Sequence, residues 1–178
     1  MQTIRISALA ACQTWPRPRV ARWLGLAALI VILDQVTKWW VELTFDFAER
    51  IPVLPVFDLT LVYNTGAAFS FLAGGSGWQR WLLASIAVIA IIVISWMIRR
   101  YQDQTRFVLA LTLILAGAIG NLIDRILLGH VIDFLLLHWR GWYYPAFNVA
   151  DMSITFGAIL IIYDEWVRWR QQKDSDRQ

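Results

Sequence analysis

The chain has 178 residues and a formal net charge of +3, and 58% of its residues are hydrophobic while only 16% are charged. A soluble domain is about one half apolar and about one quarter charged, so this composition argues against a soluble protein. The small positive charge gives no argument for binding nucleic acid, and the single cysteine excludes both an internal disulfide and a multi-cysteine metal site.

Four long apolar blocks predict four transmembrane helices, at about 22–42, 79–99, 106–127 and 147–168. A bilayer core about 30 Å thick needs roughly 20 apolar residues in a helix, and each block is close to that length. The second block is the least interrupted, whereas the first and the fourth contain acidic residues. The expected fold class is an all-α membrane protein with a small β element, organised as a single integral membrane domain over 1–178.

Lys and Arg residues are distributed unevenly among the segments that flank these blocks. Eleven of the 16 lie in the two tails, in the connection between the second and third blocks, or at the ends of the blocks that adjoin these segments. Because cytoplasmic segments are enriched in basic residues, both termini are expected in the cytoplasm. The segment 1–21 is then a cytoplasmic tail, and the segments 43–78 and 126–146 lie on the outer side.

The outer segment 43–78 is predicted to contain folded structure. Its part "IPVLPVFDLTLVYN", residues 51–64, is rich in β-branched and aromatic residues and predicts one or two short strands. Gly66 predicts a turn. The apolar run "AAFSFL", residues 67–72, predicts a short interfacial helix. The whole segment 43–78 is therefore expected to form a β platform, followed by this helix, on the outer membrane surface.

Two ionisable residues interrupt the first block, and an ionisable group inside a membrane helix is a candidate for function. Asp34 and Lys38 are four residues apart and therefore share a helical face. One interpretation is an internal ion pair in which Lys38 extends toward the membrane surface. The other is a catalytic lysine that acts together with Ser70. The sequence favours the ion pair.

The third block ends in "GNLIDR", where Asn121 shares a helical face with Asp124 and Arg125. Asp124 and Arg125 are neighbours in sequence and do not face each other on a helix, so each is expected to have another partner. Packing of this helix against a neighbour and contact with a substrate are both open as roles for these three residues.

The stretch "VIDFLLLHWRGWYYPAFNVAD" places Asp151 near the outer end of the fourth block and Asp133 just beyond the third block, where the chain is expected to return toward the membrane. Asn148 and Asp151 share one face of the fourth predicted helix. Because only a short excursion joins the two blocks, the two acids can converge at the outer surface; alternatively, each has a partner of its own. His130, Asp133 and His138 match no common zinc spacing, so no metal is expected.

These polar motifs together resemble those of the lipoprotein signal peptidase family, the bacterial type II signal peptidases, which are intramembrane aspartyl proteases. The resemblance rests on "DQVTK" in the first block, "NTGAAFSF" in the outer segment, "GNLIDR" with "GHVIDF", and "FNVAD" in the fourth block. The motifs stand in the family's order and spacing and cover about residues 22–167. The tail before residue 22 is longer than the family pattern, and the resemblance implies no role for it.

The resemblance implies that Asp133 and Asp151 form the catalytic pair. It implies no cofactor and no metal, and it leaves open which of the two aspartates carries a proton at rest. The residues implied to bind the substrate or to support the site are Asn64, Gly66, Asn121, Arg125, Asn148, Asp34, Lys38 and Asp124.

The implied function is removal of the signal peptide from diacylglyceryl-modified prolipoproteins, by cleavage before the lipidated cysteine. The expected location is the bacterial cytoplasmic (inner) membrane, with the active site at the periplasmic face. The expected partners are the prolipoprotein and membrane lipid, and the expected state is a monomer. The segment 50–64 would cradle the substrate beneath a lid at 67–72. A proton-coupled transporter and a non-enzymatic assembly subunit fit the motifs less well.

Overall fold

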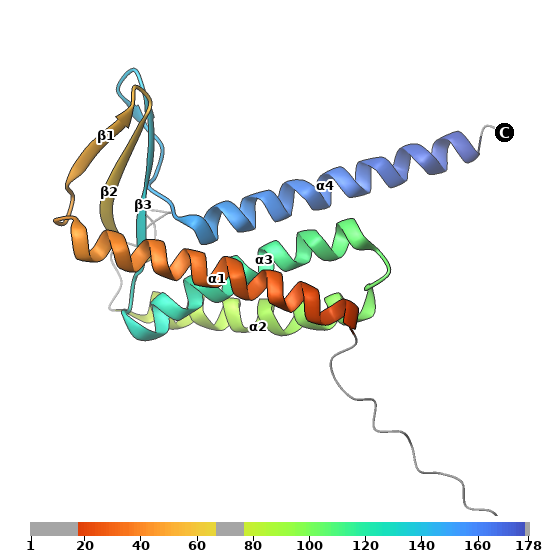
Figure 1. The fold of residues 1–178 in the computed structure, drawn as a ribbon. Helices are drawn as coiled ribbons and strands as arrows, with labels where there is room; N and C mark the ends of the chain where they lie inside the picture. Colours follow the sequence, from red (N-terminus) through yellow and green to blue (C-terminus); the bar gives the residue numbers. More distant parts are fainter. Residues whose placement is uncertain (1–17, 67–76, 177–178) are drawn as a thin grey trace, which may run out of the picture.

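The computed structural model describes residues 18–66 and 77–176 (Figure 1). The expected interfacial helix or lid at 67–72, Ser70, and most of the expected tail 1–21 lie outside these residues. The described elements, in chain order, are α1 (Pro18–Thr44), β1 (Arg50–Leu54), β2 (Phe57–Asn64), α2 (Trp78–Arg100), α3 (Thr105–Leu127), β3 (Val131–Trp139), β4 (Trp142–Tyr143) and α4 (Val149–Ser175).

Three helices in the described part of the chain are long and apolar enough to cross a membrane: Val20–Thr44 within α1, Trp78–Arg100 and Thr105–Leu127. On α2, large apolar side chains such as Ile89 and Ile92 are more than half exposed, as expected for a helix surrounded by lipid. α4 has 27 residues, but its second half contains many charged residues. The structure therefore has three candidate membrane helices in its described part, and the prediction of four transmembrane helices is not confirmed.

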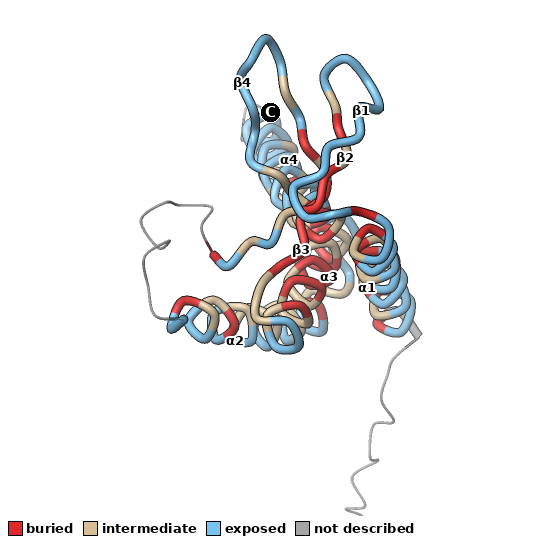
Figure 2. Tube along the Cα trace, turned by 90° about the vertical axis from the view of Figure 1, so that its left-hand side faces the viewer, coloured by how far each residue is buried: buried red, intermediate tan, exposed pale blue. Residues whose placement is uncertain are grey.

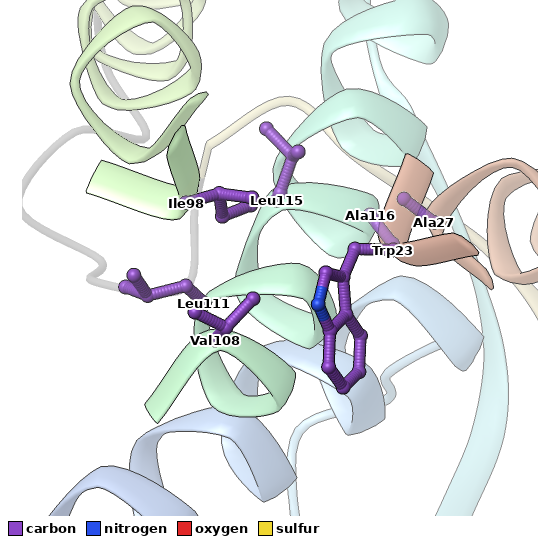
Figure 3. Close-up of a cluster of buried hydrophobic side chains, with 7 residues drawn as sticks. All are labelled: Trp23, Ala27, Ile98, Val108, Leu111, Leu115 and Ala116. Atoms are coloured by element: carbon purple, nitrogen blue, oxygen red, sulfur yellow. The ribbon is translucent and has the colours of Figure 1, made fainter. Parts of the chain in front are cut away.

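α3 is the central helix, and α1, α2 and α4 pack against it. Figure 2 shows the difference in burial, with many exposed residues along α1 and α4 and many buried ones on α3. Because α3 is surrounded by protein, it can hold polar residues such as Asn121 and Asp124 away from lipid. An apolar cluster joins α3 to α1 and α2, formed by Trp23, Ala27, Ile98, Val108, Leu111, Leu115 and Ala116 (Figure 3).

Two glycines on α3 allow its neighbours to approach closely. A Cβ atom on Gly117 would collide with the carbonyl oxygen of Ala150 in α4. A Cβ atom on Gly120 would lie 2.5 Å from Asp34 Oδ2 in α1. The missing side chains thus let the start of α4 and the acidic residue of α1 lie against the same part of α3.

The four strands form one antiparallel sheet in the order β1-β2-β3-β4, which projects from one end of the helices (Figure 1). The strands expected within 51–64 are present as β1 and β2. β3 was not predicted, because the sequence indicated only that the chain returns toward the membrane there. Its first six residues, 131–136, are almost all buried, so the strand lacks the alternation of polar and apolar residues that marks a half-exposed strand.

A second apolar cluster attaches the sheet to the end of α1, and its buried members are Val41, Phe45, Leu61, Ile132 and Phe134. Since neighbouring residues of a strand point to opposite faces, Asp133 points away from this cluster while the residues on either side of it point into it. A bridge between Leu135 and Phe147 then ties β3 to the residues just before α4.

Candidate active site

Asp133 on β3 and Asp151 in the first turn of α4 are brought together by Asn148, the residue that caps α4. The Asn148 side chain accepts a hydrogen bond of 2.9 Å from the Asp151 backbone N–H, and the Asp151 carboxylate accepts one of 3.2 Å from the Asn148 backbone N–H. Asn148 Nδ2 also donates to Asp133 Oδ1 at 2.7 Å. One residue therefore contacts both acids, and the two aspartates selected from the sequence converge.

Asp133 is only 2% exposed. Asn64, the last residue of β2, donates its Nδ2 to Asp133 Oδ2 at 3.0 Å. The Asn64 oxygen in turn accepts a hydrogen bond of 2.9 Å from the N–H of Gly66, whose φ of 109° favours glycine. Burial, followed by the nearby Asp151 carboxylate, raises the pKa of Asp133 to about 7, against the opposing effects of its amide donors and Lys38. Asp133 can therefore release and take up a proton near neutral pH.

Asp151 is half-buried, and α3 supplies a further partner for it. Asn121 donates its Nδ2 to Asp151 Oδ1 at 2.8 Å. The Asn121 Oδ1 accepts hydrogen bonds from Asn148 Nδ2 at 3.3 Å and from Lys38 Nζ at 3.1 Å. Asn121 thus connects the two acids to a cation that lies behind them.

Lys38 is buried in a charged cluster between α1 and α3. Its Nζ lies 2.8 Å from Asp34 Oδ2 and 2.8 Å from Asp124 Oδ2. The expected ion pair with Asp34 is present, but the expectation that Lys38 extends toward the membrane surface is wrong, since Lys38 is only 2% exposed. Each of its three N–H donors has an acceptor inside the protein, so the ammonium needs no contact with water.

The two acids of this cluster also hold the residues that precede the aspartate pair. Asp34 Oδ1 accepts a hydrogen bond of 2.8 Å from the N–H of Ala150, and Asp124 Oδ2 accepts one of 3.3 Å from the N–H of Ile132. Gln35 Nε2 donates to Asp124 Oδ1 at 2.8 Å. Gln35 was not among the residues predicted from the sequence, although an amide within the apolar first block is an available signal.

Arg125 lies one helical turn beyond Asn121 on α3. Its Nη1 donates to the Asn121 carbonyl oxygen at 3.1 Å. The guanidinium is close enough to Asp151, Asp133 and Asp124 to be attracted by their charges, most strongly by Asp151. α3 therefore places a cation beside the aspartate pair in addition to the amide of Asn121.

A groove of about 330 Å³ reaches Asp151. Its walls come from β3, from the chain between β4 and α4, and from the first two turns of α4. Most of the wall is apolar, so the groove can hold an apolar part of a ligand next to the Asp151 carboxylate. The lining residues are Leu137, Tyr144, Phe147, Asp151, Met152, Thr155 and Phe156.

The two histidines lie in different surroundings. His138 Nε2 is 3.0 Å from Asp58 Oδ1, and the His130 ring packs against Tyr63 with ring centroids 4.3 Å apart. Among residues 18–66 and 77–176, no three His, Cys, Asp or Glu side chains are grouped so that they could hold a metal ion.

Comparison with known proteins places these features in a family. The family model described as signal peptidase (SPase) II matches residues 26–167. The lipoprotein signal peptidase of Pseudomonas syringae pv. tomato is 54% identical over 145 residues, which cover 80% of this chain and 84% of that protein. The lipoprotein signal peptidase of Ralstonia nicotianae is 50% identical over 152 residues, covering 85% of this chain and 88% of that protein.

Two solved structures of bacterial membrane enzymes have a similar fold. One, at 2.3 Å resolution, gives a TM-score of 0.73 with 33% identity and covers 89% of this chain and 92% of the other. The second, at 1.9 Å resolution, gives a TM-score of 0.72 with 33% identity and covers 82% and 92%. The chain therefore belongs to the signal peptidase II, or lipoprotein signal peptidase, family of bacterial membrane proteases, which process prolipoproteins.

Proposed function

We propose that this chain is an aspartic endopeptidase that removes the signal peptide from diacylglyceryl-modified prolipoproteins by cleaving before the lipidated cysteine. The observation that carries the proposal is the contact of Asn148 with both Asp133 and Asp151. Two carboxylates held together in this way do not both ionise easily, so one of them retains a proton. Membership of the family supports the class of substrate.

In this proposal Asp133 carries the proton and Asp151 is the base. Asp133 is the more deeply buried of the two, and its pKa of about 7 keeps a proton available near neutral pH. Asp151 borders the groove, where a water molecule can reach it, and accepts N–H groups from Asn121 and Asn148. Since the acids interact, they titrate as a pair.

The reaction then needs only these two acids and one water molecule. Asp151 takes a proton from the water, whose oxygen forms a bond to the carbon of the scissile carbonyl, and Asp133 gives its proton to the carbonyl oxygen. In the second step Asp151 gives its proton to the amide nitrogen and the C–N bond breaks. The carbonyl re-forms as one hydroxyl returns its proton to Asp133, which restores the starting state.

The neighbouring residues are proposed to bind and orient the substrate. Asn121 and Arg125 border the acids and would orient the peptide or the carboxylates. Asn64 and Gly66 lie on the β2 side of the site, where Asn64 contacts Asp133 and Gly66 contacts Asn64. The apolar groove beside Asp151 fits a substrate that has lipid chains or an apolar signal peptide, and the sheet formed by β1 and β2 would cradle the peptide.

The proposed topology has α4 as a fourth transmembrane helix, with both termini in the cytoplasm and the acids at the periplasmic end of the inner membrane. The first half of α4 supports this, since Phe156, Ile159 and Ile162 are apolar and more than half exposed to the surroundings. The uneven distribution of Lys and Arg supports the orientation. A monomer is proposed because a single chain supplies every residue of the site.

The function is tested by incubating the purified protein with a diacylglyceryl-modified prolipoprotein and measuring the masses of the products. The expected products are the free signal peptide and a lipoprotein that begins with the lipidated cysteine. Cleavage at another position, or an intact substrate in the presence of folded protein, would contradict the proposal. Movement of a solute across vesicles without any cleavage would favour a transporter instead.

A further inference from the structure

Lys38 is a buried cation that contacts three different side chains. Two of the contacts, each 2.8 Å long, are with the carboxylates of Asp34 and Asp124, and they compensate its charge. The third, 3.1 Å long, is with Asn121 Oδ1. This contact leads toward the aspartate pair, because the Nδ2 of the same Asn121 side chain donates to Asp151.

The contacts of Asn121 select one of two orientations of its amide. The oxygen and the NH₂ group are similar in size, so the shape of the site alone does not distinguish them. An ammonium group only donates hydrogen bonds and a carboxylate only accepts them. If the amide were reversed, its NH₂ group would face Lys38 and its oxygen would face Asp151, and both hydrogen bonds would be lost. The longer contact from Asn148 Nδ2, at 3.3 Å, favours the observed orientation as well.

Burial strengthens this selection. Lys38 is 2% exposed and Asn121 is 7% exposed, so water has little access to either side chain. A hydrogen bond to an ionised group is stronger than one between neutral groups, and it is stronger inside a protein than in water. The charged contact from Lys38 therefore outweighs the uncharged contact from Asn148 in orienting Asn121.

We propose that Lys38 is a positioning residue of the aspartate pair, which acts through Asn121 to hold an N–H donor against Asp151. This inference rests on the proposed function of the pair. The N–H donor stabilises Asp151 as the carboxylate that takes a proton from water, and so leaves Asp133 as the acid that carries one. Lys38 contacts neither the substrate nor the attacking water in this role.

Charged groups lie near Asp151 on each element that packs against the start of α4. Among the described residues, Lys38 is the cation that contacts the Asn121 side chain, so its removal changes the orientation of a hydrogen-bond donor as well as the local charge. The charged groups are Asp133 on β3, Asp124 and Arg125 on α3, and Asp34 and Lys38 on α1.

The substitution Lys38→Met tests the role, because methionine has a similar length and no donor. In the folded variant kcat is expected to fall by about 10- to 100-fold while KM changes little, since the lost hydrogen bond acts on the chemical step. The alkaline limb of the profile of kcat against pH is expected to move up, because the charge of Lys38 lowers the pKa of Asp133 and its removal lets Asp133 keep its proton to a higher pH. A purely structural role for Lys38 would move neither quantity in folded protein.

A double-mutant cycle with Asn121→Leu shows whether the effect passes through Asn121. In the Asn121→Leu background, Lys38→Met is expected to reduce kcat no further, because the amide that it orients is already absent. Lys38→Met leaves two buried carboxylates without their cation. The cycle is therefore repeated with Asp124→Asn added to the wild type, to both single variants and to the double variant. Asp124→Asn removes one of the two uncompensated charges, so this second cycle serves where Lys38→Met alone does not fold.

Three results would overturn the inference. The first is a folded Lys38→Met protein with unchanged kcat and an unchanged pH profile. The second is effects of Lys38→Met and Asn121→Leu on kcat that simply multiply. The third is a loss of activity as complete as that of Asp133→Asn, which would assign Lys38 to the chemistry itself. Failure of the proposed function is distinguishable from all three, because it would appear as retained cleavage by folded Asp133→Asn.

Discussion

Asn148 donates its Nδ2 to the Asp133 carboxylate across 2.7 Å from the position that caps α4. A cap residue stabilises a helix by accepting a hydrogen bond from one of its free N–H groups. Here the Asn148 oxygen accepts the N–H of Asp151, and this leaves Nδ2 to face Asp133. The start of α4 and the geometry of the aspartate pair therefore cannot change independently.

Asn148→Ala is expected to lower both stability and the rate of cleavage. Loss of the cap costs about 1 kcal/mol, and Asp133 loses one of its two amide donors. Unfolding in detergent measures the first effect, and turnover of a lipidated prolipoprotein measures the second. Asn148→Ser is the matched control, since serine can cap the helix but has no amide for Asp133. It should recover most of the stability and little of the activity; recovery of full activity would show that the contact with Asp133 is unimportant.

The rate of cleavage is expected to fall as pH rises through about 7. The pKa of Asp133 is raised to about 7 by burial and by Asp151, so above this pH Asp133 lacks the proton that it gives to the scissile carbonyl. The profile of kcat/KM against pH measures this limb. The control is Asp164→Asn, which removes a buried acid of the second half of α4 that has no contact with the pair. A rate that stays constant across neutral pH would contradict the assignment of Asp133 as the acid.

The free energy of unfolding should also depend on pH through Asp133. The pKa of Asp133 rises from 3.8 to about 7 on folding, so between these pH values the folded protein binds more protons than the unfolded chain. The free energy of unfolding is therefore expected to fall as pH rises from about 4 to about 7. Asp133→Asn should flatten this dependence in thermal unfolding experiments. An equally steep decline in the variant would show that other groups cause it.

Gly117→Ala is expected to separate α3 from the start of α4. Its Cβ would collide with the Ala150 carbonyl oxygen, next to Asp151, and such overpacking costs about 1–3 kcal/mol. Both the melting temperature and the rate of cleavage should fall. Gly25→Ala is the control, because a Cβ atom there meets nothing within 4 Å. Equal behaviour of the two variants would argue against a close approach of the helices at Gly117.

Much of the candidate site could be predicted because polar residues are rare in apolar helices and need partners. Asp34, Asn121 and Asp124 were conspicuous for this reason, and the structure places them in one connected set of contacts with Lys38. The strands within 51–64 could be predicted from their β-branched residues for a similar reason, since the pattern is local.

The features that were missed depend on distant neighbours. Lys38 is buried because Asn121, 83 residues away in sequence, and Asp124 accept its hydrogen bonds, and no local pattern specifies such acceptors. β3 is buried on both faces, so its sequence resembles an ordinary apolar segment. The second half of α4 is rich in charged residues, so the apolar pattern did not indicate that the helix continues to Ser175, beyond the predicted end of the fourth block.

The most direct test of the aspartate pair is the rate at which folded Asp133→Asn and Asp151→Asn release the signal peptide from a diacylglyceryl-modified prolipoprotein. Asp164→Asn serves as the control, because Asp164 is also a buried acid but pairs with Arg106 and Arg168 in the second half of α4. The predicted result is no detectable cleavage by either variant of the pair and nearly normal cleavage by the control. Nearly normal cleavage by folded Asp133→Asn or Asp151→Asn would contradict the proposed mechanism.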